Sequence, residues 1–194
     1  MKKRYVALCF LLGACTGGDV TGVITPPEIS LGVQEVASGF SNPLFVISPP
    51  GDTRLFVVEQ DRFEEVDVVE SHAKGVNYGW NIMEGSSCFA TTSCNQTGLE
   101  FPPLVYDHSN GGCSITGGYV YRGSIITDLI GHYFYSDYCA GFLKSFRYQN
   151  GRATEERTYT IGSIGSITSF GQDASGELYM TSSNGKVYRI IQTG

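Results

Sequence analysis

Three histidines are the side chains of this sequence best suited to proton transfer near neutral pH: His72, His108 and His132. His108 directly follows Asp107 in a polar stretch, so a carboxylate could orient its imidazole as a general base. A loop histidine that hydrogen-bonds the backbone is the alternative interpretation. His72 and His132 lie in predicted turns, where we expect a structural or solvated histidine. The pair Asp107–His108 is therefore the candidate catalytic base.

Acidic residues are concentrated in the segment Glu64, Glu65, Asp67 and Glu70. Carboxylate oxygens are the ligands that Ca²⁺ prefers, so this run could bind the ion. The same alternation of acidic and apolar residues is also typical of a strand with one face in solvent. The sequence leaves both interpretations open.

The cysteines indicate disulfides rather than a metal site. Six are present, and two of them fall in the first fifteen residues. The other four are Cys88, Cys94, Cys113 and Cys139. Zinc is disfavoured because there is no Cys-x-x-Cys pair and no histidine at ligand spacing. Three pairings are formally possible. We predict Cys88–Cys94, which would close a short loop, and Cys113–Cys139, which would join the ends of neighbouring strands.

The N-terminus has the pattern of an export signal. A basic segment, residues 2–4, precedes an apolar run, residues 5–12, that is too short to span a bilayer. Leu12-Gly13-Ala14-Cys15 resembles the lipobox of bacterial lipoproteins, which implies a signal peptide over residues 1–14 and a lipid on Cys15. An ordinary secretory signal with a chance cysteine is the alternative.

Residue 16 is threonine rather than aspartate, and by resemblance to lipoprotein sorting signals this favours the outer membrane, facing the periplasm. Residues 15–29 are rich in Gly, Thr and Pro and predict a flexible tether. The chain carries 13 basic and 19 acidic residues. Without the three basic residues of the signal, 10 face 19, a net charge of −9. A nucleic-acid partner is therefore not expected.

Short, β-branched or aromatic segments bounded by Gly, Pro, Asn or Asp predict an all-β fold in one domain, residues 30–194. The candidate strands are residues 34–36, 44–47, 54–58, 65–69, 118–122, 133–136, 142–148, 167–172, 178–181 and 186–191. The recurring antiparallel unit is typical of β-propeller blades. At about 40–50 residues a blade, the domain provides about three to four of them. Such a chain closes a small ring, assembles with another copy, or stays an open arc whose exposed edges favour self-association.

Four phrases together carry a resemblance to a known family: Phe40–Leu44 with Arg54–Gln60, Glu64–Val69, Asn77–Gly85, and Cys113–Gly123. They resemble the glucose/sorbosone (aldose sugar) dehydrogenases that depend on pyrroloquinoline quinone (PQQ), whose propeller normally has six blades. In full-length members the first phrase lies several blades before the second. In this sequence the two phrases abut, which implies an internal shortening near Gln60. The resemblance also implies that residues 34–38 could close the ring beside residues 186–191.

The family oxidises aldoses at C1 and passes a hydride to PQQ, with a histidine base, Ca²⁺, and arginine and lysine side chains that hold the quinone carboxylates. By the resemblance, Thr116 matches a cofactor-contacting threonine, and Glu59 and Gln60 match backbone positions that bind the cofactor's Ca²⁺. The catalytic histidine and an Arg-Asn-Pro motif are absent. Residues 166–170 stand where the family has paired arginines, and Asp137 and Tyr138 stand near its lysine.

Two functions follow from this comparison of residues. One is a PQQ-dependent sugar dehydrogenase, which we expect to be inactive as this chain alone. The other is a non-catalytic cell-envelope lipoprotein that binds a carbohydrate or a protein partner. In both cases the membrane would be reached only through the N-terminal lipid.

Overall fold

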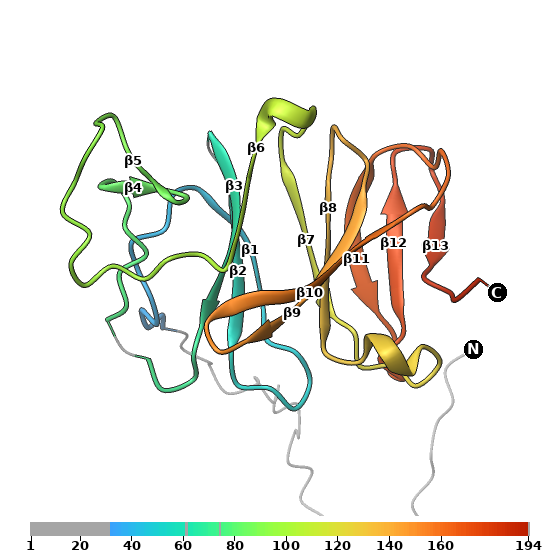
Figure 1. The fold of residues 1–194 in the computed structure, drawn as a ribbon. Helices are drawn as coiled ribbons and strands as arrows, with labels where there is room; N and C mark the ends of the chain where they lie inside the picture. Colours follow the sequence, from blue (N-terminus) through green and yellow to red (C-terminus); the bar gives the residue numbers. More distant parts are fainter. Residues whose placement is uncertain (1–31, 61, 74, 194) are drawn as a thin grey trace, which may run out of the picture. The chain divides into compact units, whose positions relative to one another are not determined.

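Antiparallel β-strands make up nearly all of the regular secondary structure in the computed structural model, which describes residues 32–60, 62–73 and 75–193 (Figure 1). The predicted signal peptide, the tether up to residue 29, and the lipid-bearing Cys15 lie outside the described residues. Residues Glu35–Gly194 form one compact unit. All the sheets named below belong to that unit.

Three sheets carry the architecture. The first sheet has the order β1-β2-β3-β6, with β1 (Pro43–Ile47), β2 (Leu55–Gln60), β3 (Phe63–Val69) and β6 (Leu104–Asp107). The central sheet has the order β10-β9-β8-β7, with β7 (Ile115–Val120), β8 (His132–Asp137), β9 (Leu143–Gln149) and β10 (Arg152–Tyr159).

The last sheet has the order β11-β12-β13, with β11 (Ile167–Gln172), β12 (Leu178–Ser182) and β13 (Val187–Arg189). A small hairpin pairs β4 (Met83–Glu84) with β5 (Ser87–Cys88). Two short 3₁₀ turns, η1 (His108–Asn110) and η2 (Thr127–Leu129), complete the elements. Among the described residues no helix is long and apolar enough to cross a membrane.

The central sheet is buried on both faces, which explains its many aromatic residues. Toward the first sheet it presents Tyr133 and Phe146, and Tyr133 stacks on Phe56 with ring centroids 5.0 Å apart. Toward the last sheet it presents Phe134 and Leu143. Side chains alternate across a strand, so apolar residues at successive positions serve two different cores. These two cores hold the three sheets face to face.

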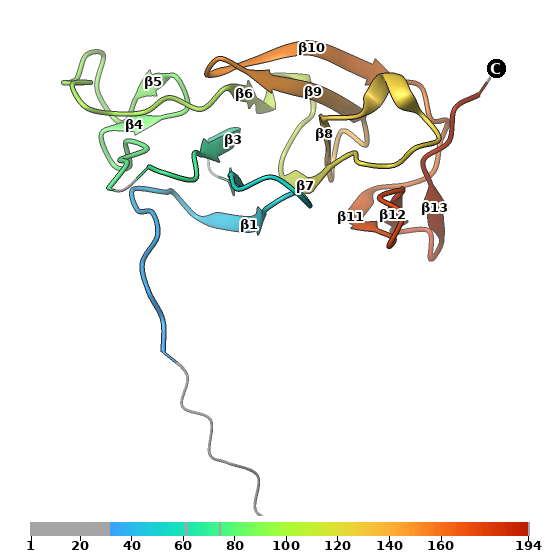
Figure 2. The same ribbon diagram turned by 90° about the horizontal axis from the view of Figure 1, so that it is seen from below.

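The arrangement of the sheets is that of adjacent propeller blades. Strand β7 of the central sheet contacts β1 and β2 on one side and β11 on the other. Figure 2 shows β1, β7 and β11 along the same side of the unit, while the outer strands β6 and β10 lie opposite. The predicted all-β, propeller-like fold of about three to four blades is confirmed.

The strand predictions differ from the structure at several places. No strand forms at residues 34–36, and Ser38 makes an isolated parallel bridge with Asn77 instead of a contact with the end of the chain. In the part that the structure describes, β13 pairs with β12 alone, so the ring closure that residues 34–38 could have made is not present. Strands β4, β5, β6 and β10 were not predicted. Strand β10 is polar and mostly exposed, because it is the outer edge of its sheet and owes its conformation to pairing with β9.

Both predicted disulfides are confirmed. Cys88 pairs with Cys94, and Cys113 pairs with Cys139. The second bond joins the segment before β7 to the segment after β8, two strands that are neighbours in the central sheet. It therefore fixes the end of the sheet at which the candidate site lies.

Candidate functional site

A groove of about 320 Å³ runs along the inner strands at the disulfide end of β7. We call it the inner-strand groove. Its lining comes from β1, β2, β7 and β11 and from the turn after β8: Leu44, Phe45, Val58, Ser114, Ile115, Thr116, Gly117, Tyr138, Thr168 and Ser169. The polar groups among them are hydroxyls. The groove therefore offers neutral hydrogen-bonding groups beside apolar surface.

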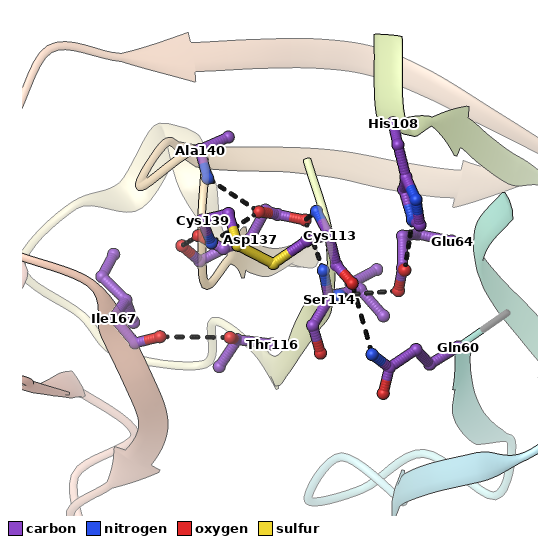
Figure 3. The surroundings of a disulfide bond; sticks show 12 residues. Gln60, Glu64, His108, Cys113, Ser114, Thr116, Asp137, Cys139, Ala140 and Ile167 are labelled. Carbon is purple, nitrogen blue, oxygen red and sulfur yellow. Dashed lines mark hydrogen bonds and ion pairs between the residues drawn. A yellow bond between two sulfur atoms is a disulfide. The ribbon is translucent and has the colours of Figure 1, made fainter. Parts of the chain in front are cut away.

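Thr116, the residue predicted to contact a cofactor, lies in this groove. Its Oγ1 donates a hydrogen bond to the carbonyl of Ile167 at 3.1 Å, which joins β7 to β11 (Figure 3). The β7–β8 pairing shifts register directly after Thr116, and a Cβ added to Gly117 would lie 2.7 Å from the Phe45 ring. The glycine lets β1 and β7 approach closely, and this approach forms one wall of the groove.

Asp137 organises the disulfide end of the groove. Its Oδ2 accepts hydrogen bonds from the backbone N–H groups of Cys113 and Ser114, both at 3.0 Å, and from the Tyr106 hydroxyl at 2.9 Å. Its Oδ1 accepts the N–H groups of Cys139 and Ala140, both at 2.8 Å (Figure 3). The nearby cysteines share a disulfide, so their thiols are not metal ligands. By sequence resemblance, Asp137 only stands near the position of the family's lysine, so its role in holding this turn was not predicted.

Gln60 and Glu59 point to opposite faces of the first sheet. Gln60 faces β7, and its Nε2 donates to the carbonyl of Cys113 at 3.2 Å (Figure 3). Glu59 faces the other way and accepts the backbone N–H of Ser41. The structure therefore brings Gln60, but not the Glu59 side chain, to the strand that carries Thr116.

His108 is held by Glu64 rather than by Asp107. Its Nε2 lies 2.9 Å from Oε1 of Glu64, and Oε2 of Glu64 accepts the N–H of Ile115 at 2.7 Å (Figure 3). Burial raises the pKa of Glu64, while the Ile115 N–H and His108 oppose that rise. The Asp107 carboxylate caps η1 by accepting from the N–H and hydroxyl of Ser109. The sequence does not reveal this partner, because Glu64 and His108 are 44 residues apart.

The other two histidines do not reach the groove. His72 is exposed in a turn. His132 is buried, and its Nδ1 lies 3.1 Å from the hydroxyl of Ser145. The groove lining thus includes no histidine among the residues that the structure places.

The inner-strand groove does not fit the carboxylates of an anionic quinone, because its described lining holds no lysine or arginine. Arginines gather instead at the opposite end of β7, where Arg54, Arg122 and Arg147 line a separate cavity of about 210 Å³. Those cations already have partners. Arg54 and Arg122 pair with Asp52, and Arg147 pairs with Glu155.

Comparison with known proteins identifies the fold. A model of the Glucose / Sorbosone dehydrogenase family matches residues 35–189, which is most of the sequence. The chain belongs to the glucose/sorbosone dehydrogenase family. Within related sequences it is 31% identical over 191 residues to the HIPL1 protein of Arabidopsis thaliana, covering 80% of this chain and 27% of that protein. It is 34% identical over 109 residues to the human Hedgehog-interacting protein, covering 48% and 15%.

Solved structures of dehydrogenases share this architecture. A glucose dehydrogenase superimposes with a TM-score of 0.62 at 18% identity, covering 90% of this chain and 49% of that one. The PQQ-bound aldose sugar dehydrogenase of Streptomyces coelicolor gives a TM-score of 0.55 at 18% identity, covering 82% and 42%. This glucose/sorbosone dehydrogenase family member therefore spans under half the length of these structures. It spans about a quarter or less of the two sequence relatives.

Proposed function

We propose that this member of the glucose/sorbosone dehydrogenase family is a non-catalytic binding protein that holds a neutral carbohydrate in the inner-strand groove. The observation that carries the proposal is the lining of the groove. Ser114, Thr116 and Thr168 line a space that also borders Leu44 and Phe45; the hydroxyl of Thr116 bonds the carbonyl of Ile167, and that of Thr168 bonds the hydroxyl of Thr181. Neutral donors and acceptors beside apolar surface suit a polyhydroxylated ring better than a charged ligand.

Loss of catalysis is supported by what surrounds the groove. Sugar oxidation needs a base that takes the hydroxyl proton and cations that hold the quinone. Within the described lining neither is present, and His108 is engaged by Glu64 outside that lining.

Binding is tested by calorimetric titration of the purified chain with a panel of neutral mono- and oligosaccharides. Thr116→Val and Thr168→Val should each weaken binding about tenfold, since each removes a hydrogen-bonding hydroxyl from the groove. Thr97→Val is the matched control, because Thr97 is exposed and does not line the groove. If both groove variants bind every sugar as well as the unmodified chain, the groove is not the binding site.

A dehydrogenase is the second candidate, favoured by the fold shared with the PQQ-bound enzyme. The assay is dye-linked oxidation of glucose and other aldoses after addition of PQQ and Ca²⁺. We expect no turnover. Quinone-dependent turnover by the purified chain would refute the non-catalytic proposal.

We also propose that the protein is exported and anchored by a lipid on Cys15, at the outer membrane and facing the periplasm. The support is the signal-like N-terminus and the lipobox-like residues before Cys15. Labelled palmitate should be incorporated into the expressed protein and lost in Cys15→Ser. A protein that takes up no label and fractionates as soluble would exclude the anchor.

A further inference from the structure

Three arginines line a cavity at the end of β7 opposite the inner-strand groove. We call it the arginine cavity, and its volume is about 210 Å³. Arg54 directly precedes β2, Arg122 follows the end of β7, and Arg147 lies on β9. No acidic residue belongs to its described lining. The walls of the cavity are therefore positively charged or neutral.

The three guanidinium groups lie close together. Arg54 and Arg122 both donate to Oδ2 of Asp52, Arg122 at 3.3 Å. Arg122 and Arg147 both reach Gly131, where an added Cβ would lie 3.6 Å and 2.7 Å from their Nη1 atoms. This glycine leaves the room in which the two cations approach each other. Like charges held this close repel each other unless an anion neutralises them.

The carboxylates that pair with these cations lie outside the described lining of the cavity. Asp52 accepts two side-chain hydrogen bonds from Arg54 and one from Arg122. The bonds from Arg54 lower the pKa of Asp52 to about 2, burial opposes this shift, and the charge of Arg122 adds to it. Glu155 lies 3.2 Å from Nε of Arg147, but this Nε makes no hydrogen bond within the described residues and Glu155 is 46% exposed. One ionised carboxylate therefore serves two guanidinium groups, and the third has a partner that is half in water.

Many of the guanidinium donors have no acceptor in the described part of the chain. Each guanidinium carries a planar fork of N–H groups. Arg54 uses Nε and Nη2 on Asp52, and Arg122 uses Nη2. Arg147 uses Nη1, which donates to the carbonyl of Ile130 at 2.7 Å. The three side chains are only 27%, 27% and 26% exposed, so water reaches few of the remaining donors. Confined donors that line one cavity are a binding set for an oxyanion.

Aromatic rings hold one of the cations in place. Cζ of Arg54 lies 5.4 Å from the ring centroid of Tyr148 and 5.8 Å from that of Phe56. Asp52 raises the pKa of Arg54, burial opposes the rise, and the charge of Glu70, which is outside the lining, adds to it. The guanidinium thus stays charged although it lies against apolar rings. Water weakens its attraction for an anion less in this setting than on an open surface.

We propose that Arg54, Arg122 and Arg147 bind a phosphate group in the arginine cavity. A guanidinium fork matches two oxygens of a phosphate or of a carboxylate. Three forks from separate segments suit the tetrahedral, doubly charged phosphate better than a planar carboxylate with one charge. The volume is below the range of about 300–1,000 Å³ that holds drug-sized ligands, so the cavity admits a single small group. The arginine cavity shares no residue with the inner-strand groove, and the proposal does not depend on the proposed function.

The test is calorimetric titration of the purified chain with sodium phosphate at about pH 8, where phosphate carries two charges. Thermal unfolding is measured in parallel. We expect one phosphate per chain with a Kd on the order of 10⁻³ M, as for an ion of few atoms, and a Tm that rises with phosphate concentration. Sulfate should act similarly, and acetate should bind at least about tenfold more weakly. Equal effects of phosphate, acetate and chloride at the same ionic strength would mean general screening by salt and would overturn the proposal.

Loss of one cation gives a second readout. Arg122→Gln should weaken phosphate binding at least about tenfold, and Arg122→Lys should weaken it less, because lysine keeps the charge but not the fork. Arg152→Gln is the matched control, since it also removes a positive charge, but Arg152 is exposed on β10 and outside the cavity. Arg147→Gln repeats the test if Arg122→Gln does not fold. Folded variants that bind phosphate as tightly as the unmodified chain would show that these arginines are not the ligands.

A free phosphate ion and the headgroup of a phospholipid present the same group to the cavity. Glycerol 3-phosphate carries the headgroup phosphate without acyl chains, so the same titration separates the two sources. Binding as tight as that of inorganic phosphate supports a phosphate ester as the ligand. Much weaker binding supports the free ion, because the cavity would then exclude the glycerol.

Discussion

Asp137 shows how much one carboxylate can hold in place at the residue scale. It is wholly buried and accepts five hydrogen bonds, four from backbone N–H groups and one from Tyr106. These bonds tie both sides of the Cys113–Cys139 disulfide to the end of β8. The carboxylate thereby shapes the turn from which Tyr138 reaches the inner-strand groove.

Asp137→Ala should destabilise the chain by about 3 kcal/mol or more, because four backbone N–H groups and the Tyr106 hydroxyl would lose a buried acceptor at once. Urea unfolding of the oxidised protein measures the change. Asp128→Asn, at an exposed position, should remain within about 0.5 kcal/mol of the unmodified chain. A small loss for Asp137→Ala would mean that the disulfide alone holds this turn.

His132 should make stability depend on pH. Burial lowers its pKa in the folded state, and the charges of Arg147 and Arg157 add to this, while Glu155 opposes it. Folding therefore favours the neutral ring. The stability this contributes is present above the unfolded pKa of about 6.5 and is lost as pH falls toward the lower folded value.

His132→Gln should flatten the part of the pH–stability curve just below about pH 6.5, since glutamine does not titrate. Urea midpoints at several pH values for both proteins measure the difference. Equal slopes for the two proteins would show that carboxyl groups account for the acid sensitivity.

At the element scale, the close approach of neighbouring strands limits which side chains a strand position can accept. In β7, a Cβ added to Gly118 would lie 1.6 Å from the carbonyl oxygen of Phe134 on β8. Gly171 in β11 has no atom within 4 Å of the same position. Two glycines inside strands therefore have different roles, and only the first is required by packing.

Gly118→Ala should cost about 3 kcal/mol or more, because β7 must move away from β8 and disturb the register shift beside Thr116. Gly171→Ala should change stability by less than about 1 kcal/mol. Thermal unfolding of both variants is the measurement. A well-folded Gly118→Ala with an unchanged Tm would contradict the packing of β7 against β8.

At the scale of the whole molecule, the order of the strands decides which strand edges remain unpaired. The two segments that abut in the sequence form the neighbouring strands β2 and β3, paired from Leu55 with Val69 to Gln60 with Glu64. The result is three blade-like sheets, with β13 pairing only with β12 among the residues described. An unpaired strand edge is a template for association with another chain.

We therefore expect the purified chain to self-associate with rising concentration, as seen by light scattering coupled to size exclusion. Val187 is 67% exposed on β13, so Val187→Lys should reduce association by placing a charge on the open edge. Lys144→Arg, which keeps its charge within β9, is the control. A monomer at all concentrations would show that this edge is protected in solution.

The sequence by itself determined the strands whose residues are apolar enough to be buried, such as residues 133–136 and 55–58, and the two disulfides. It also carried the motifs of the family. Local pattern suffices there, because β-branched and aromatic residues favour strands wherever they pack. It did not predict β10, since an exposed edge strand has no apolar signature of its own.

Only the tertiary structure decided which carboxylates are buried and what they contact. Period-two alternation in β3 separates Glu64 from Glu65 and Asp67, but it does not say whether either face meets water. The answer depends on the segment around Tyr78 and Gly85 covering one face and β7 covering the other. The pairing of Glu64 with His108 and the convergence of Glu59, Glu65 and Asp67 are likewise contacts between strands. Such contacts follow from sheet register, which no single segment of the sequence contains.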